Sequence, residues 1–210
     1  FMLLGLIEFY KLFKKHELIN VRWETGFLLG LLIYGLLISI TYDYLPLISI
    51  SIILPIIFLF ALTELWRKKE NPLINMSVLI FGVIYIVIPF FLIVLINHLE
   101  NTSSSLNTNK IPLVAGMFIL VWSNDTFAYL TGRMIGKIKL FERISPNKTW
   151  EGTIGGIVFT ILAGYLIALF TSDASDTMFW IISALIIAPC SIVGDLLESL
   201  FKRSLKISAP

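Results

Sequence analysis

The chain has 210 residues, of which 57% are hydrophobic and only 14% are charged. Soluble globular domains contain about 45–50% apolar and about 25% charged residues, so this composition excludes an ordinary soluble domain. The formal net charge of +2 identifies no partner, because the positions of the charges carry more information than their sum.

Apolar segments of about 20 residues, the length that spans a bilayer as a helix, follow one another along the chain. A first segment, Phe1–Phe13, is long enough for only part of a span. The six complete segments are Gly26–Tyr42, Leu45–Leu65, Leu73–Asn97, Ile111–Gly132, Gly152–Phe170 and Met178–Phe201. None shows the alternation of a membrane strand. We predict an all-α polytopic membrane protein with about seven transmembrane helices, the first partial, in a single domain over residues 1–210.

Lysines and arginines alternate between the connections of these segments. The connections after the first, third, fifth and seventh segments contain Lys14, Lys15, Arg22, Arg67, Lys68, Lys69, Arg133, Lys137, Lys139, Arg143, Lys148, Lys202, Arg203 and Lys206. The other three connections contain only Lys110. Basic connections remain on the cytoplasmic side, so we expect the chain to begin outside and end inside. The loops Asn101–Asn109 and Thr171–Thr177 are then external.

The stretch SNDTFAYLTGR, near the inner end of the fifth segment, places the ionisable residue Asp125 inside a span. A charged side chain at the centre of a span costs about 2.5–3.5 kcal/mol on insertion scales and marks a functional candidate. Asp125 precedes Arg133 by about two helical turns, so it lies near the inner membrane boundary. The alternative interpretation is a structural polar contact between helices.

The stretch GDLLESLFKR, at the inner end of the last segment, carries four polar residues on one helix face. Asp195, Glu198, Ser199 and Lys202 have the spacing i, i+3, i+4 and i+7. Two carboxylates one turn apart suit Mg²⁺, which takes one or two carboxylates together with substrate phosphates. Lys202 and Arg203 could hold those phosphates. The alternative interpretation is an amphipathic helix end with a Glu198–Lys202 ion pair.

The stretch RISPNKTWEGTIGG is a polar run between two apolar segments. Ser145 and Pro146 predict a helix start, since serine is a good N-cap and proline fits the first helical position. The residues that could cradle phosphate groups here are Lys139, Arg143, Asn147, Lys148 and Thr149. The alternative interpretation is a basic loop attracted to anionic lipid headgroups.

Carboxylates suited to a divalent metal and a basic patch are thus expected on the same side of the membrane, at the same depth. This combination suits transfer of a phosphate-containing group between a soluble substrate and a lipid, because metal and cationic side chains neutralise the charge. The sequence contains no Walker A motif, histidine-rich zinc motif or Ser/His/Asp arrangement.

Over nearly its whole length the chain resembles the phosphatidate cytidylyltransferases, or CDP-diacylglycerol synthases. The resemblance is strongest over NDTFAYLTGRMIGKIKLFERISPNKTWEGTIGG and SIVGDLLESLFKRSLKI, and the SPNKTWEG and GDLLESLFKR motifs are highly specific together. It implies an Mg²⁺-dependent enzyme of phospholipid biosynthesis. Such an enzyme condenses CTP with phosphatidate to give CDP-diacylglycerol and pyrophosphate.

The resemblance also implies roles for individual residues. Asp195 would bind the metal, and the SPNKTWEG segment with Lys148 would help form the nucleotide and phosphate site. The spacing on the last segment adds Glu198 as a second metal ligand, and with Asp125 in its span we expect catalysis to rest on Asp125, Lys148 and Asp195. The expected substrate-binding residues are Arg133, Ser145, Asn147, Lys148, Thr149, Glu151, Lys202 and Arg203. We expect a multi-pass protein of a bacterial inner membrane, with its site facing the cytoplasm. We expect no nucleic-acid partner, and a homodimer is one candidate assembly.

Two departures from the family pattern affect these expectations. Phe127 replaces the glycine of the DTGAY motif that many members have, which we take as a tolerated variant. The family signature continues through a Lys-Asp pair, a Gly-His-Gly-Gly turn and an Asp-Arg pair, whereas this chain ends in SLKISAP. We therefore expect a fragment that lacks an N-terminal helical region and the second metal-binding aspartate. Such a fragment should insert into membranes without forming CDP-diacylglycerol.

Two other functions share some of these features. A CTP-dependent polyprenol or phytol kinase would have a related fold but transfer a phosphoryl group, and the SPNKTWEG motif argues against it. An ion-coupled transporter would use Asp125 and Asp195 near the middle of the membrane. The polar clusters here are instead expected at the cytoplasmic face, away from the usual transporter site.

Overall fold

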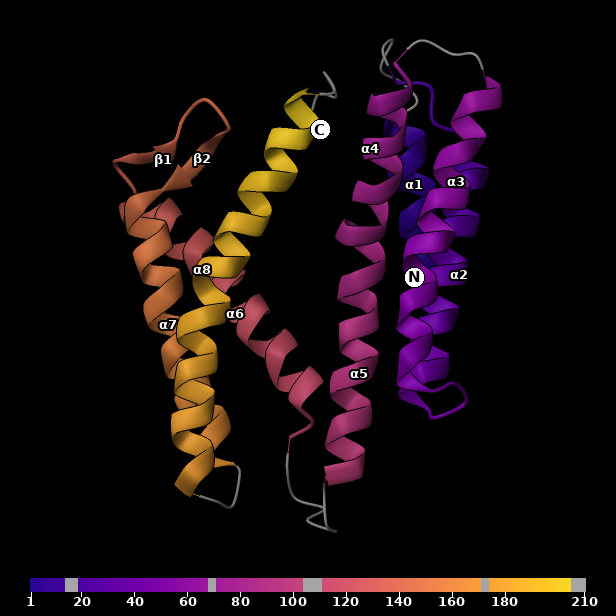
Figure 1. The fold of residues 1–210 in the computed structure, drawn as a ribbon. Coiled ribbons are helices and arrows are strands. Elements are labelled where there is room, and N and C mark those ends of the chain that lie inside the picture. Colours follow the sequence, from indigo (N-terminus) through magenta and orange to yellow (C-terminus); the bar gives the residue numbers. More distant parts are fainter. Residues whose placement is uncertain (14–18, 68–70, 104–110, 171–173, 205–210) are drawn as a thin grey trace. The chain divides into compact units, whose positions relative to one another are not determined.

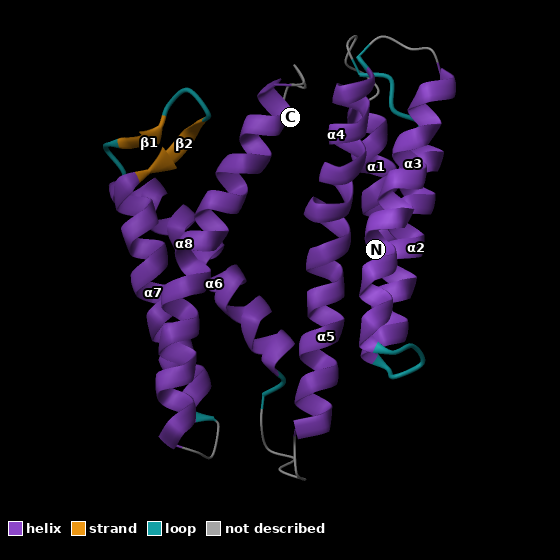
Figure 2. Cartoon of the chain, viewed as in Figure 1, coloured by secondary structure: helices purple, strands orange, loops and turns teal. Residues whose placement is uncertain are grey.

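The computed structural model describes residues 1–13, 19–67, 71–103, 111–170 and 174–204. Helices dominate these ranges, as Figure 2 shows, so the all-α class is confirmed. The structure also contains one short β-hairpin that the sequence did not predict. The chain divides into two compact units, Phe1–Leu99 and Glu100–Pro210. The single membrane domain stays a prediction.

The first unit is a helical bundle whose expected spans are interrupted by proline. Its elements are α1 (Met2–Phe13), α2 (Trp23–Thr41), the 3₁₀ helix η1 (Leu47–Ile52), α3 (Ile53–Arg67), α4 (Pro72–Gly82), the π-helix η2 (Val83–Val87) and most of α5 (Ile88–Ser103). Pro55 lies in the first turn of α3 and lacks an N–H group, so the turn before it is a 3₁₀ helix. Pro89 likewise follows the π-turn η2, because its ring displaces the carbonyl of the preceding turn.

The core of the first unit is built around Tyr10 of α1. This side chain is fully buried, and its hydroxyl donates a hydrogen bond of 2.9 Å to the carbonyl of Leu79 in α4. Gly26 lets α2 approach the ring closely, because a Cβ at that position would lie 2.2 Å from a ring carbon. The buried side chains of Leu6 and Leu29 complete the contact between α1 and α2.

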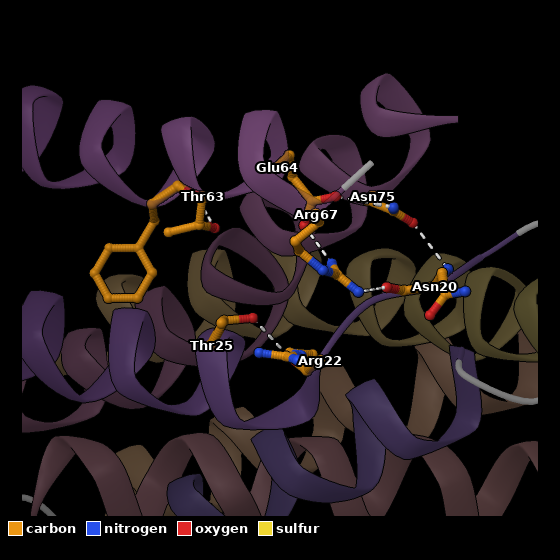
Figure 3. A network of polar contacts seen from close by, with 8 residues as sticks. Asn20, Arg22, Thr25, Thr63, Glu64, Arg67 and Asn75 are labelled. Carbon is orange, nitrogen blue, oxygen red and sulfur yellow. Dashed lines mark hydrogen bonds and ion pairs between the residues drawn. The ribbon is translucent and has the colours of Figure 1, made fainter. Parts of the chain in front are cut away.

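A network of polar contacts ties together three segments of the first unit (Figure 3). Glu64 of α3 forms an ion pair with Arg67, whose guanidinium also donates to the carbonyl of Asn20. The Asn75 amide donates to Glu64 Oε2 at 3.0 Å, and its Oδ1 accepts the N–H of Asn20 at 2.8 Å. The Glu64 and Arg67 side chains are only 2% and 12% exposed, so this is a largely buried ion pair with hydrogen-bonded neighbours.

The second unit packs three long helices against one another and adds the hairpin. Its elements are α6 (Leu113–Ile135), β1 (Lys139–Phe141), β2 (Ser145–Thr149), α7 (Trp150–Leu169) and α8 (Ala174–Ser204). Leu120, Trp180 and Ala184 are buried among these helices. Pro189 lies inside α8, where it removes one backbone hydrogen bond, and Figure 1 shows the axis of this helix changing direction along its length.

The hairpin is antiparallel and irregular. Lys139 pairs with Thr149 at its base, and Phe141 pairs with Ser145 near its turn. The second pair lies two residues further along β1 but four residues back along β2, so β2 carries the extra residues and bulges. Pro146 falls in this stretch, where a residue without an N–H group is tolerated because the ladder is already interrupted.

The helix start predicted at Ser145 and Pro146 is wrong. These residues belong to β2, and α7 begins at Trp150. Thr149 occupies the N-cap, where its Oγ1 accepts the N–H of Gly152 at 3.2 Å. Pairing with β1 holds the preceding residues extended, so the next side chain able to cap the helix is that of Thr149.

Six helical stretches among the described residues are long and apolar enough to cross a membrane: Trp23–Thr41, Leu47–Glu64, Pro72–Thr102, Leu113–Ile135, Trp150–Leu169 and Thr177–Ser204. They correspond one to one to the six complete segments expected from the sequence. The shorter α1, with 12 residues, is not among them. Several positions used for the topology lie outside the described residues: Lys14, Lys15, Lys68, Lys69, Lys110, Lys206, and parts of the loops Asn101–Asn109 and Thr171–Thr177. The orientation across the membrane stays a prediction.

Candidate active site

The hairpin and the C-terminal half of α8 lie at the same end of the second unit (Figure 1). Lys148 belongs to the bulged part of β2, next to the base of the hairpin. Its Nζ lies 2.9 Å from Oδ2 of Asp195, near the middle of the C-terminal half of α8. Two residues that are 47 positions apart in the sequence are therefore in direct contact.

A second contact joins α8 to α6 beside the first. Ser191 lies one helical turn before Asp195 and donates a hydrogen bond of 3.1 Å to Oδ1 of Asp125. Asp125, Lys148 and Asp195, the three residues expected to be catalytic, are thus linked through one face of α8. Their catalytic role stays a prediction, but their proximity is a feature of the fold.

The Lys148–Asp195 ion pair lies at the surface of the second unit. The two side chains are 27% and 49% exposed, respectively. Ion pairs at exposed positions contribute only about 0–1 kcal/mol, so either partner can exchange the other for a ligand at small cost. From the positions they occupy here, Asp195 could bind a cation, and the Lys148 ammonium group could donate a hydrogen bond to a phosphate oxygen.

Close packing of α7 on α6 fixes the helix that carries Asp125. Gly156 permits this approach, because a Cβ there would lie 2.9 Å from both Asn124 Oδ1 and the Ala128 Cβ. Asn124 is 1% exposed, and within the described part of the chain its Oδ1 has no hydrogen-bond partner. Its amide nitrogen lies 3.5 Å from Asp125 Oδ1, at the upper limit of a hydrogen bond. The buried amide therefore packs beside the carboxylate and binds it only weakly.

The last turns of α8 contain the ion pair that the alternative interpretation of this helix required. Lys202 Nζ lies 2.7 Å from Glu198 Oε1, and both side chains are about half exposed. Arg203 instead turns toward the hairpin, where its guanidinium donates to the carbonyl of Arg143. Two of the expected substrate-binding residues, Lys202 and Arg203, thus have partners within the protein.

Other expected site residues also have partners within the protein. Both carboxylate oxygens of Glu151 accept backbone N–H groups, from Lys137 and Ile138, at 3.1–3.2 Å. Arg133 donates to the hydroxyl of Tyr129 at 3.4 Å, within α6. None of these contacts involves Lys148 or Asp195. The remaining expected residues, Ser145, Asn147 and Thr149, lie on β2.

The groups beside Lys148 that could bind a metal ion all offer oxygen atoms. Asp125, Ser191 and Asp195 offer two carboxylates and a hydroxyl, a set that suits a hard divalent cation. Within the described residues no three His, Cys, Asp or Glu side chains converge as a preformed metal centre. The residues present therefore fit a metal that is held partly by substrate or water.

Sequence reasoning did not single out Ser191. The signal was available, because Ser191 precedes Asp195 by four residues and so lies on the same helix face. The hairpin was also missed, since its strands have only three and five residues and its second strand contains a proline. Short, irregular strands give too little alternation to be recognised.

Fold and site together define a polytopic helical membrane protein with an exposed cation and carboxylates at one end of three packed helices. The sequence model of the cytidylyltransferase family matches residues 1–208, and the chain belongs to this family. The resemblance stated from the SPNKTWEG and GDLLESLFKR motifs is thereby confirmed.

Individual relatives agree with this assignment. The chain is 37% identical to the phosphatidate cytidylyltransferase of Haemophilus influenzae over 145 residues, which cover 67% of the chain and 48% of the relative. It is 41% identical to the phosphatidate cytidylyltransferase of Staphylococcus epidermidis over 86 residues, covering 41% of the chain and 33% of the relative. For that of Brucella abortus the identity is 41% over 87 residues, covering 41% and 32%. The chain thus spans about half or less of the length of these relatives.

Proposed function

We propose that the protein to which this chain belongs is a membrane nucleotidyltransferase that condenses CTP with phosphatidate. The observation that carries the proposal is the 2.9 Å contact between Lys148 and Asp195. It brings the two motifs together as an exposed cation beside an exposed carboxylate. The names of the relatives, all phosphatidate cytidylyltransferases, support the choice of substrates.

The proposed reaction joins the phosphate of phosphatidate to the α-phosphate of CTP and releases pyrophosphate. An oxygen of the phosphatidate phosphate forms a bond to the α-phosphorus of CTP, while the bond from that phosphorus to the α–β bridging oxygen breaks. Pyrophosphate leaves, and CDP-diacylglycerol remains in the membrane. Such a transfer depends on orientation and on neutralising charge, and little covalent chemistry is asked of the protein.

The chain's own residues would share this work. Lys148 is positioned to bind a phosphate oxygen of the nucleotide, because its ammonium group is partly exposed and needs only to leave Asp195. Ser191 holds Asp125 toward α8, which keeps two carboxylates near the same end of the unit. The hairpin holds Lys148 beside α8, within reach of Asp195.

Mg²⁺ is the metal that we propose for this site. Asp195 and Asp125 would hold it, since Mg²⁺ favours one or two carboxylates and keeps water or substrate phosphate as its other ligands. Glu198, the other expected ligand, would first have to leave Lys202, from which it is 2.7 Å away. When bound, the metal would neutralise charge on the reacting phosphates.

We also propose that the site faces the cytoplasm from the inner membrane of a bacterium. The hairpin, its flanking residues and the end of α8 gather Lys137, Lys139, Arg143, Lys148, Lys202 and Arg203 at one end of the second unit. Basic residues concentrate on the cytoplasmic side, where CTP is also available. The homodimer and the absence of a nucleic-acid partner stay predictions.

Product analysis tests the reaction. The full-length protein in lipid vesicles containing phosphatidate would receive CTP labelled at the α-phosphate or, in parallel, at the γ-phosphate. The proposal requires α-label in a CDP-lipid and γ-label in pyrophosphate. Transfer of the γ-label to a lipid alcohol would instead identify a CTP-dependent kinase, and retention of both labels in CTP would exclude both enzymes.

A further inference from the structure

We infer that Glu151 is a positioning residue, which anchors the base of the hairpin and so places Lys148 opposite Asp195. The effect on turnover rests on the proposed function, whereas the anchoring itself does not. Glu151 lies in the first turn of α7, three residues after Lys148. Its negative charge is also favourable there, near the N-terminus of the helix.

The contacts of Glu151 account for both of its oxygens. Oε2 accepts the N–H of Lys137 at 3.1 Å and that of Ile138 at 3.2 Å. Oε1 also accepts the N–H of Ile138, at 3.2 Å. Hydrogen bonds from neutral donors to a charged acceptor are stronger than those between neutral groups, so one side chain holds two consecutive backbone amides.

These two amides lie in the connection between α6 and β1. α6 ends at Ile135, and β1 begins at Lys139, so Glu151 captures the short connection between them. The carbonyl of Ile138 in turn accepts the N–H of Trp150 at 2.9 Å, and Lys139 pairs with Thr149. The start of α7 and the start of β1 are therefore locked side by side.

Lys148 is the residue immediately before this lock. With the base fixed, the ammonium group can reach Asp195 but can move little along α8. The turn of the hairpin has its own anchor, because Arg203 of α8 donates to the carbonyl of Arg143. Loss of Glu151 should therefore loosen the base locally, with the turn still attached.

Two substitutions separate anchoring from direct contact with a ligand. Glu151→Ala removes both acceptors. Glu151→Gln keeps one oxygen that can accept from Lys137 and Ile138, but it removes the negative charge. An anchor should tolerate glutamine better than alanine, whereas a carboxylate that binds metal should fail equally in both. Glu142→Gln is the matched control, since Glu142 is an exposed carboxylate at the hairpin turn.

The experiment uses the full-length protein in nanodiscs. Hydrogen exchange of peptides covering residues 136–142 would be compared with the kinetics of CDP-lipid formation. We expect Glu151→Ala to speed exchange at Lys137 and Ile138 about 10-fold or more, since these amides lose their acceptor. Turnover should fall by about 10- to 100-fold, because a misplaced catalytic group is costly. Glu151→Gln should fall between alanine and wild type in both measurements, and Glu142→Gln should match wild type.

Unchanged exchange in Glu151→Ala would overturn the inference, and so would equal losses in the glutamine and alanine variants. If the Glu151→Ala protein is not produced in membranes, the hydrogen-exchange rate of Glu151→Gln tests the inference instead. An exchange rate equal to that of wild type would then overturn the inference. If Glu151→Ala exchanges faster but the wild-type protein makes no CDP-lipid, the anchoring role of Glu151 stands and the proposed function is rejected.

Discussion

Each unit of the chain contains an ion pair that links polar side chains, and the two pairs differ in how far they are exposed. Glu64 is buried and Arg67 is largely buried, and both also contact Asn20 or Asn75. Lys148 and Asp195 come from a hairpin and a helix, and both are substantially exposed. Removing one partner of a buried pair leaves a charge without a partner in an apolar environment, which costs much free energy. Separating an exposed pair costs little free energy. The first arrangement suits a structural role, and the second suits a site that exchanges partners with a ligand.

Asp195→Asn should give the largest effect on function. Removing the charge from the proposed metal ligand should lower Mg²⁺-dependent formation of CDP-lipid by at least about 1,000-fold, which corresponds to several kcal/mol of lost charge stabilisation. Insertion and folding should persist, since this side chain is 49% exposed. The measurement is turnover of the full-length protein at matched membrane expression. Activity near that of wild type would remove Asp195 from the metal site.

Glu64→Ala should have the largest effect on stability. The substitution leaves the largely buried Arg67 guanidinium without its carboxylate and removes an acceptor of the Asn75 amide. Breaking a buried pair from one side costs about 3–5 kcal/mol. The thermal transition of the detergent-solubilised protein should therefore fall well below that of the Glu142→Gln control. Equal transitions would show that the network of Figure 3 does not stabilise the first unit.

Lys148→Ala should have an intermediate effect. Loss of one charge-assisted contact to phosphate should raise the KM for CTP by about 10- to 100-fold, or about 1.5–3 kcal/mol. The thermal transition should barely move, because the ion pair with Asp195 is exposed. Steady-state kinetics and vesicle binding would be measured together. Unaltered CTP kinetics with weaker vesicle binding would favour the lipid-headgroup interpretation of the basic stretch.

Lys202→Ala should have the smallest effect on stability. Its ion pair with Glu198 joins residues four apart on one helix, with side chains 47% and 55% exposed. Pairs of this kind contribute about 0.3–0.5 kcal/mol, and salt screens them. A thermal transition within about one degree of wild type, in low and in high salt, is expected. If the thermal transition of Lys202→Ala fell as far as that of Glu64→Ala, exposed and buried pairs would not differ in their contribution to stability.

The helical spans were predictable from the sequence, because a long apolar segment specifies a membrane helix independently of its tertiary contacts. Asp125 and Asp195 were recognisable because an acidic residue in a span is costly. The 2.9 Å contact between Lys148 and Asp195 was not predictable, since it depends on the bulge in β2 and on the packing of α8. The capping role of Thr149 was missed for the same reason: pairing with β1 overrode the local preference of Ser145 and Pro146 for a helix start.

The central claim is that Lys148 and Asp195 form one nucleotide site, and a double-mutant cycle tests it most directly. Equilibrium binding of CTP in the presence of Mg²⁺ would be measured for the full-length wild type, Lys148→Ala, Asp195→Asn and the double variant. Residues that share one ligand should be coupled, so the double variant should differ from the sum of the single losses by about 1 kcal/mol or more. Losses that add within about 0.3–0.5 kcal/mol would contradict the claim, because they would mean that the two side chains act at separate places.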